Sequence, residues 1–322
     1  MPEKPRCLLV EPIHKHYDAI LRKHCEVVRP AEANEAGIAA AAADCDAILI
    51  RTKGAVTDKV LAAAPRLKVV ARHGVGLDHI DLEAAAKRGV WVVYTPAGSL
   101  DAVAEHTWMM ILALAKFTCR GDRAMRAIDF GFRSRHESLQ VKGKTLGVLG
   151  LGRIGTRVAE IAHRGFGMNV IYTDLLKFPA KEKKLKARKV PLRTLLEKSD
   201  VLTVHVPLTP KTRGMLGAAE FARMRPQAHL VNCARGAVMD GYALAAALQA
   251  GKLAGAGIDV FDPEVPPADH PLLACETAVF SPHNAAQTAE ARFNYAAVVE
   301  DILRVLSGKP PKFPANQPKP SR

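Results

Sequence analysis

The chain has 322 residues, of which 48% are hydrophobic, and this is enough for two domains with separate cores. It holds no uninterrupted apolar run of about 18 residues and no signal-peptide pattern near its start, so we predict a cytoplasmic protein that does not span a membrane. The formal net charge of +14 fits either a nucleic-acid-binding protein or a basic surface that attracts anionic metabolites.

The first part of the chain alternates between strand-like and helix-like segments. Residues 1–97 contain five β-like runs, CLLVEP, EVVRP, AILIRT, LKVVARH and WVVYTP, separated by Ala-rich stretches. This alternation predicts a parallel sheet covered by helices. The apolar segment 102–117 then predicts a buried helix where the chain crosses to a second domain.

A second series of strand-like runs begins at KTLGVLG and continues through NVIYTD, DVLTVHV, HLVNCAR, AGIDVF and AVFSPH. It predicts a second doubly wound sheet. Residues 288–307 have the apolar spacing of a single amphipathic helix, which we expect to pack on the first domain, and we expect the Pro-rich tail 308–322 to be disordered. The predicted fold class is α/β, with two Rossmann-like doubly wound parallel-sheet domains. The substrate domain would be discontinuous (1–97 and 287–322), and the dinucleotide-binding domain would cover 98–286.

Most of the excess positive charge is scattered along the chain. The exception is KEKKLKARK at 181–189, which lacks the interleaved aromatic residues of a single-strand nucleic-acid site. We interpret this run as a solvated helix face and expect no nucleic-acid partner.

The segment TLGVLGLGRIG places Gly150, Gly152 and Gly155 in a GxGxxG pattern between an apolar strand and a helix. There the first glycine permits a tight turn, the second lets a pyrophosphate approach the backbone, and the third allows close packing of helix and strand. The next strand ends at Asp174, close to the expected spacing of about 20 residues for an acid that binds both hydroxyls of the adenosine ribose. Because a carboxylate there repels the extra phosphate of NADP, the pattern predicts NAD as cofactor. We predict no metal site.

Three polar residues follow the later strands: Arg235 after HLVNCA, Glu264 after AGIDVF, and His283 after AVFSP. The carboxyl ends of parallel strands form the edge where such sheets bind ligands. A guanidinium can hold a carboxylate in two prongs, an imidazole can exchange a hydroxyl proton, and a carboxylate can orient that imidazole. Each residue alone is more often part of the scaffold, but together they predict chemistry on a small hydroxy or keto acid.

In this order, GLGRIG, Asp174, VHVPLTPKTRG, NCARG, GIDVFDPEVP and SPH resemble the D-isomer-specific 2-hydroxyacid dehydrogenases over nearly the whole chain. That family includes D-3-phosphoglycerate dehydrogenases, glyoxylate and hydroxypyruvate reductases, formate dehydrogenases and C-terminal-binding corepressors. The resemblance implies an NAD-dependent oxidoreductase that acts on the CH–OH group of a small anionic D-2-hydroxy acid or reduces the matching 2-keto acid. It also implies a homodimer in which the segment 120–138 forms a crossing arm.

The resemblance further implies roles for single residues. Arg235 would bind the substrate carboxylate and carbonyl, His283 would be the general acid/base, and Glu264 would pair with His283. The implied cofactor contacts are Gly150, Gly152, Arg153, Ile154, Gly155, Asp174, Val206, Pro207, Cys233, Ala234, Arg235, Asp259, His283 and Ala285.

The segment RHGVGLDHID resembles the substrate-carboxylate loop of the family, in which consecutive backbone N–H groups would form an anion nest. Arg51 and Arg72 match positions that are also basic in phosphoglycerate dehydrogenases. The site could therefore accommodate a substrate with a second anionic group. The segment 94–99 departs from the phosphoglycerate-type pattern, and the choice between phosphoglycerate-, hydroxypyruvate- and glyoxylate-type substrates stays open. The implied substrate contacts are Arg51, Arg72, Gly74, Val75, Gly76 and Arg235.

One alternative comes from a different class of protein. An NAD(H)-sensing binding protein of the corepressor type would keep the same three polar residues, and the basic composition is compatible with it. A serine-pathway phosphoglycerate dehydrogenase would often carry a further C-terminal regulatory domain, although short forms exist.

Overall fold

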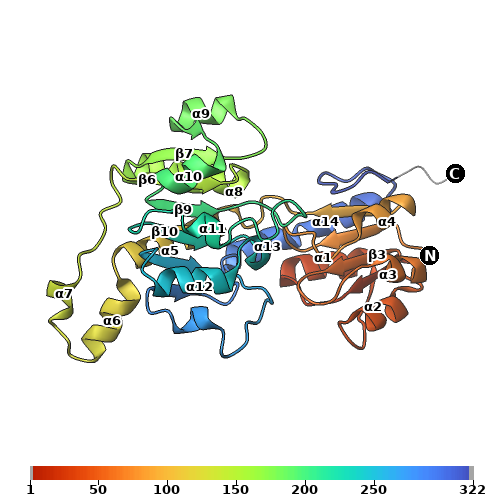
Figure 1. Cartoon of the computed structure of the whole chain (residues 1–322). Helices are drawn as coiled ribbons and strands as arrows, with labels where there is room; N and C mark the ends of the chain where they lie inside the picture. The colour runs from red at the N-terminus through yellow and green to blue at the C-terminus, as the bar shows by residue number, and fades with distance from the viewer. Residues whose placement is uncertain (1–2, 319–322) are drawn as a thin grey trace. The chain divides into compact units, whose positions relative to one another are not determined.

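The computed structural model describes residues 3–318, and the chain divides into two compact units (Figure 1). The first unit joins the segment up to Ser99 to the segment from Gln287 onward, and the second is Leu100–Ala286. No helix within residues 3–318 is long and apolar enough to cross a membrane.

The first unit is built on a five-stranded parallel sheet with the strand order β2-β1-β3-β4-β5. Alternate side chains of each strand enter two separate apolar clusters, so both faces of the sheet are covered. The strands are β1 (Arg6–Leu9), β2 (Glu26–Val28), β3 (Ala47–Ile50), β4 (Val69–Arg72) and β5 (Trp91–Tyr94).

The end of the chain returns to this sheet as two helices. The sequence pattern predicted one helix over 288–307, whereas the structure has α13 (Ala289–Ala296) and α14 (Val298–Leu306), with Ala297 between them. Helix α14 packs against β4, β5 and α1. The other helices of this unit are α1 (Lys15–His24), α2 (Glu35–Ala42), α3 (Asp58–Ala63) and α4 (Leu82–Lys87).

The tail after α14 is ordered up to Pro318, so the prediction of disorder from Gly308 onward is wrong for the described residues. The backbone N–H groups of Lys312 and Phe313 donate to the buried carboxylate of Asp301 at 2.6 and 2.9 Å. The next residues run beside β5, where the N–H of Ala315 donates to the Val92 carbonyl. Residues 319–322 of the prediction lie outside the described part of the chain.

The second unit is built on a seven-stranded parallel sheet with the order β12-β11-β10-β9-β6-β7-β8. Strand β6 comes first in the chain and lies between β7 and β9, so the chain winds outward from it in both directions. Ligands bind at such a switch point in doubly wound sheets. Two parallel-sheet units confirm the predicted fold class. The strands are β6 (Thr145–Leu149), β7 (Asn169–Thr173), β8 (Arg188–Lys189), β9 (Val201–Val204), β10 (His229–Asn232), β11 (Gly255–Ile258) and β12 (Ala278–Phe280).

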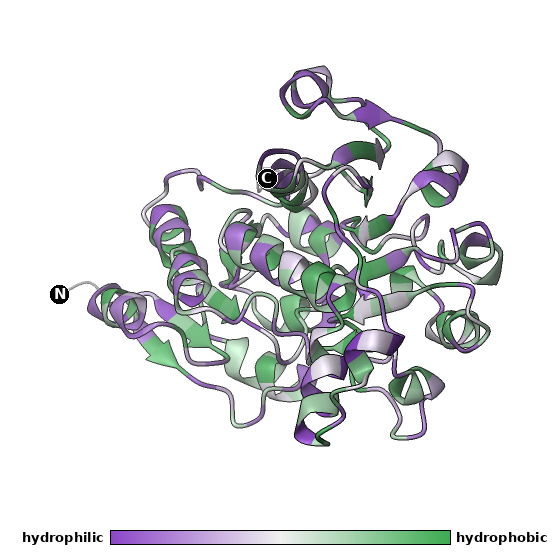
Figure 2. Ribbon diagram, turned by 90° about the vertical axis from the view of Figure 1, so that its left-hand side faces the viewer, coloured by the Kyte–Doolittle hydropathy of each residue, from purple (hydrophilic) through white to green (hydrophobic). Residues whose placement is uncertain are grey.

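Helices cover both faces of this sheet. The predicted apolar helix is α5 (Leu100–Ala115), which packs against α8 and β10. Figure 2 shows the central strands mostly in hydrophobic colour and the outer helices in mixed colours, as burial of both sheet faces requires. The helices are α5, α6 (Thr118–Arg126), α7 (Phe132–Arg135), α8 (Arg153–Phe166), α9 (Pro179–Leu185), α10 (Leu192–Lys198), α11 (Ala218–Phe221) and α12 (Gly241–Gln249), with 3-10 turns at Gly236–Val238 and Pro271–Ala274.

The basic run 181–189 is helical only in its first half. Helix α9 ends at Leu185, Lys186 adopts a left-handed conformation, and the run continues into the short strand β8. The interpretation as one solvated helix face is therefore corrected. Three of its lysines also have specific partners. Lys184 forms an ion pair with Glu160 at 2.6 Å, Lys189 donates to the Leu175 carbonyl at 3.2 Å, and Lys181 contacts the glycine-rich loop described next.

Candidate active site

The glycine-rich loop leaves β6 at the switch point and enters α8. Gly150 has φ +96°, and a Cβ there would lie 2.9 Å from the backbone of the segment after β9. At Gly155 a Cβ would lie 2.1 Å from the Gly150 carbonyl, whereas at Gly152 no heavy atom of the described residues lies within 4 Å of that position. Helix α8 starts at Arg153 without a side-chain cap. The open surface at Gly152 and the uncapped first turn fit the pyrophosphate of NAD, because Arg153 and Ile154 present backbone N–H groups there.

Asp174 follows β7 beside this loop. Its Oδ2 accepts the N–H of Leu151 at 2.8 Å, and its Oδ1 accepts the N–H of Leu176 at 3.0 Å. Because each carboxylate oxygen can accept a second hydrogen bond, the side chain can still bind two ribose hydroxyls. Lys181 donates to the Leu151 carbonyl at 2.7 Å and lies over the ring of Phe178, a contact that sequence reasoning missed.

The loop after β10 carries Arg235. Asn232 holds its backbone, because its side-chain amide donates to the Arg235 carbonyl at 3.0 Å and accepts the Ala234 N–H at 2.9 Å. A Cβ at Gly236 would lie 2.1 Å from the Phe261 backbone, so this loop packs directly against the loop after β11. The Arg235 side chain is partly exposed, and its Nη1 donates to the Ala234 carbonyl at 2.7 Å.

Three further residues with implied cofactor contacts flank these loops. Val206 and Pro207 follow β9, and the Val206 nitrogen is one of the atoms that a Cβ at Gly150 would approach within 2.9 Å. Cys233 follows β10, where burial raises the pKa of its thiol to about 12. The thiol is therefore neutral at physiological pH and cannot act as a nucleophile there.

His283 and Glu264 meet at the carboxyl ends of β11 and β12. The imidazole Nδ1 is hydrogen-bonded to Glu264 Oε1, and both side chains are exposed, at 46% and 60%. His283 has φ +49°, which is uncommon for a residue other than glycine. Its backbone N–H donates to the carbonyl of Asp259 at 2.8 Å.

Asp259 is buried behind this loop and has side-chain and backbone donors around it. Its Oδ1 accepts the Ser281 hydroxyl at 2.5 Å and the Asn284 N–H at 2.9 Å, and its Oδ2 accepts the Ala285 N–H at 3.2 Å. Burial pulls the pKa of this carboxyl upward, but hydrogen bonds from His106, Ser281 and the Asn284 N–H outweigh burial and lower the pKa from its usual value. Asp259 is therefore ionised at neutral pH.

The predicted substrate-carboxylate loop belongs to the first unit and follows β4. Arg72 donates from Nε to the Gly76 carbonyl at 2.8 Å and from Nη1 to the His73 carbonyl at 3.1 Å, so these two donors hold the loop. The Gly74 N–H donates to the Arg72 carbonyl at 2.9 Å. The Gly74 N–H therefore has a partner within the loop. In this conformation the predicted anion nest would consist of the N–H groups of Val75 and Gly76.

Two other residues at this edge of the five-stranded sheet bear on the loop. Arg51 follows β3 and is partly exposed. Burial lowers the pKa of His73 to about 4, so its imidazole is neutral at physiological pH. The structure thus places Arg51, Arg72 and the 74–76 loop at one edge of one sheet, and their contact with substrate stays a prediction.

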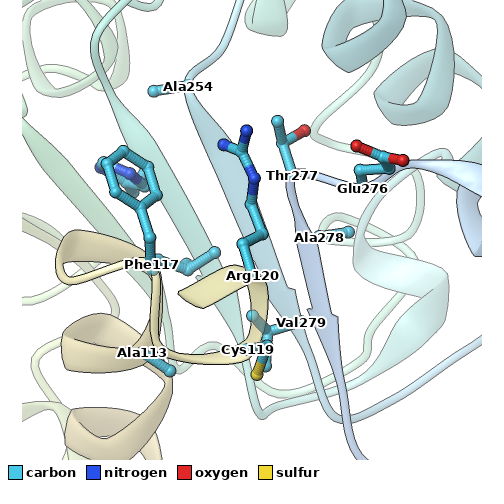
Figure 3. Close-up of a pocket in the computed structure, with 11 residues that line it drawn as sticks. Ala113, Phe117, Cys119, Arg120, Ala254, Glu276, Thr277, Ala278 and Val279 are labelled. Atoms are coloured by element: carbon cyan, nitrogen blue, oxygen red, sulfur yellow. The ribbon is translucent and has the colours of Figure 1, made fainter. Parts of the chain in front are cut away.

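A small hollow lies at the opposite edge of the seven-stranded sheet, at the amino ends of β10, β11 and β12. His229, Ala254 and Thr277 line it, together with Phe117 and Arg120 from the region where α5 passes into α6 (Figure 3). The sheet separates it from the glycine-rich loop and His283, which lie at the carboxyl ends. The hollow takes no part in the site described above.

The comparisons with known proteins identify the family. Residues 108–285 match the model of the NAD-binding domain of D-isomer-specific 2-hydroxyacid dehydrogenases. The chain belongs to this family. The resemblance noted in the sequence is thereby confirmed, and so is NAD as the cofactor, because the glycine-rich loop and Asp174 lie inside the matched region.

The matches to named relatives cover most of this chain. It is 38% identical over 274 residues to a D-3-phosphoglycerate dehydrogenase of Archaeoglobus fulgidus, a match that covers 85% of this chain and 52% of the relative. It is 39% identical over 279 residues to a glyoxylate reductase of Korarchaeum cryptofilum, with 85% and 83% covered. Among solved structures, D-lactate dehydrogenase of Aquifex aeolicus, complexed with NAD and lactic acid, superposes with a TM-score of 0.85 at 29% identity and with 94% and 96% covered. The chain thus spans about half the length of the phosphoglycerate dehydrogenase.

Cofactor choice gives a first test. Replacing Asp174 with alanine is expected to narrow the preference for NADH over NADPH, mainly by weakening NADH binding, because the ribose hydroxyls lose their acceptor and a 2′-phosphate no longer meets a negative charge. Titration of each cofactor by fluorescence, in the unmodified protein and the variant, measures the change. Equal affinity for both cofactors in the unmodified protein would contradict this role of Asp174.

Proposed function

We propose that this chain is an NAD-dependent D-2-hydroxyacid dehydrogenase that interconverts a small D-2-hydroxy acid and its 2-keto acid. The observation that carries the proposal is the hydrogen bond between His283 and Glu264, which share a sheet edge with Arg235 and the glycine-rich loop. This combination brings a proton donor, a carboxylate-binding cation and a dinucleotide cradle into one unit. We propose 98–286 as the dinucleotide-binding domain and 1–97 with 287–322 as the substrate domain.

NADH, when bound, supplies the hydride that reduces the keto carbon. Because Nδ1 of His283 is hydrogen-bonded to Glu264, Nε2 is the ring nitrogen left for the substrate. In reduction the imidazolium donates a proton from Nε2 to the developing alkoxide, and in oxidation the neutral ring takes that proton back. Glu264 orients the ring and stabilises its charged form. Arg235 binds the substrate carboxylate and the carbonyl oxygen through its fork of N–H groups.

The substrate is proposed to be of the phosphoglycerate, hydroxypyruvate or glyoxylate type. The names of two relatives support the first and the last of these, since one is a D-3-phosphoglycerate dehydrogenase and the other a glyoxylate reductase. The N–H groups of Val75 and Gly76 would bind the carboxylate, and Arg51 would favour a substrate with a second anionic group. The cytoplasmic location stays a prediction.

The test is a screen of 2-keto acids with NADH. Purified protein is mixed with NADH and with glyoxylate, hydroxypyruvate, phosphohydroxypyruvate or 2-ketoglutarate, and NADH absorbance is followed. We expect oxidation of NADH with at least one of the first three, and oxidation slower by at least about 10²-fold when a His283→Ala variant, purified in the same way, replaces the protein. NADH binding without oxidation by any of these acids would contradict the proposal and favour the NAD(H)-sensing alternative.

The proposal includes a homodimer formed through the segment that joins α5 to β6. In Figure 1 α6 and α7 lie on an extension that leaves the body of the second unit. Three large apolar side chains of this segment are exposed, namely Met125 at 58%, Ile128 at 88% and Phe130 at 64%. Apolar side chains gathered on one projecting segment are typical of a surface that a second copy covers.

This dimer can be tested by changing the exposed side chains. Ile128→Asp together with Phe130→Asp is expected to turn a dimer into a monomer, because two charges would be buried in the interface without partners. Sedimentation equilibrium of both proteins measures the change, and Leu175→Asp, an exposed apolar residue after β7, is the matched control. A monomeric unmodified protein, or a variant that stays dimeric, would exclude this interface.

A further inference from the structure

A chain of three hydrogen-bonded polar side chains runs behind the His283 loop, and two of them, His106 and Ser281, have no role so far. His106 Nε2 lies 2.9 Å from Ser281 Oγ, and Ser281 Oγ lies 2.5 Å from Asp259 Oδ1. His106 comes from the middle of α5, whereas Ser281 and Asp259 follow β12 and β11. Their side chains are 15% exposed for His106 and fully buried for Asp259.

The direction of these hydrogen bonds follows from the number of protons. A serine hydroxyl has one proton, and Asp259, as a carboxylate, can only accept. The Ser281 proton therefore points to Asp259, and the bond between His106 and Ser281 requires a proton on His106 Nε2. The order is a donated N–H from His106 to Ser281, followed by a donated O–H from Ser281 to Asp259.

Asp259 in turn sets the conformation of the loop. Its two carboxylate oxygens accept the N–H groups of Asn284 and Ala285, and its backbone carbonyl accepts the N–H of His283. The same loop holds His283 at φ +49°. A residue other than glycine in this region is strained by about 1–3 kcal/mol, and it persists only where the surroundings hold it. Asp259 provides these contacts, because its carboxylate binds the N–H groups of both residues that follow His283.

We infer that His106 and Ser281 are positioning residues for the proposed reaction, because they fix the Asp259 carboxylate that keeps the His283 loop in its left-handed conformation. Without them, Asp259 could rotate away from the Asn284 and Ala285 N–H groups, and the loop would relax toward an ordinary backbone conformation. The imidazole would then leave Glu264, and Nε2 would no longer point where the substrate oxygen binds. A misplacement of about 1 Å can cost about 10²-fold in rate.

The inference rests on the proposed function for its kinetic readout but not for its structural one. The variants are His106→Leu, which removes the N–H donor, and Ser281→Ala, which removes the hydroxyl. His106→Gln is the conservative variant, since its amide can donate to Ser281 from nearly the same place. The matched control is His163→Leu on α8, which changes a partly exposed helical histidine of the same unit that is outside this chain.

The structural readout is amide hydrogen exchange of the segment 282–286, followed by mass spectrometry. We expect faster exchange there in His106→Leu and Ser281→Ala, because the Asn284 and Ala285 N–H groups lose a fixed acceptor. Exchange should stay at the wild-type rate in His106→Gln and in His163→Leu. Wild-type exchange of this segment in both His106→Leu and Ser281→Ala would overturn the inference, and so would faster exchange spread over the whole unit.

The kinetic readout separates positioning from general stability. With the best 2-keto acid of the screen, His106→Leu and Ser281→Ala are expected to lose at least about tenfold in kcat with KM changed by less than about threefold, whereas His106→Gln keeps most of the activity. Unchanged kcat with faster loop exchange would overturn the positioning role. If the wild type reduces no 2-keto acid, the proposed function fails while the exchange experiment still decides whether His106 and Ser281 hold the loop.

Discussion

Replacing His283 with alanine is expected to lower kcat by about 10²- to 10⁴-fold, the usual contribution of a positioned acid or base. The variant keeps the backbone hydrogen bond from residue 283 to Asp259, which does not involve the side chain. The loop should therefore stay in place while the proton donor disappears. The pyrophosphate cradle at Gly152 follows a different strand, so the dissociation constant of NADH should stay within about threefold.

Two comparisons make the His283 result specific. Glu264→Gln keeps an acceptor for Nδ1 but removes the charge, so its loss of kcat should be smaller than that of His283→Ala. His163→Leu, on α8, should leave kcat within about twofold, because it changes a partly exposed residue away from the loop. Stopped-flow reduction at saturating NADH measures all three. A His283→Ala variant with more than about a tenth of wild-type kcat would remove this residue from the reaction.

Local sequence patterns predicted the fold and the sheet edge at which the candidate site residues lie, and the reason is physical. Strands of a parallel sheet are buried on both faces, so they appear as short apolar runs, and the polar residues that end them must lie at one edge. Arg235, Glu264 and His283 were all found in this way. The glycine spacing was equally informative, because the close approach at Gly155 excludes any side chain.

Contacts between distant segments were not predictable from such patterns. His106 and Ser281 are 175 positions apart, and in the sequence His106 only interrupts an apolar helix. The ordered tail is a second case, since Pro-rich polar composition is typical of disorder. Its order comes from Asp301, whose buried carboxylate accepts two tail N–H groups, and from pairing with Val92. In both cases a buried carboxylate holds a loop that local composition describes poorly.

Arg235→Lys is expected to lower kcat/KM for the 2-keto acid by at least about 10²-fold, equivalent to about 2.7 kcal/mol of transition-state stabilisation. The guanidinium offers a rigid fork that can bind a carboxylate and a carbonyl oxygen together, whereas the lysine ammonium is a point charge on a flexible chain. The loop itself should not change. Asn232 holds the backbone at Arg235, and Gly236 packs against Phe261 without help from the side chain.

Because the loop is held by its backbone, the loss in Arg235→Lys should fall on substrate handling and not on NADH binding. The matched control is Arg213→Lys, an exposed arginine of the same unit whose ion pair with Asp262 spans 3.6 Å. An exposed pair of this kind contributes about 0–1 kcal/mol, so the control should keep kcat/KM within about threefold. Initial rates over a range of keto-acid concentrations, together with NADH titration, separate the two variants. If Arg235→Lys turned over as fast as the control, the arginine would have no part in binding the substrate.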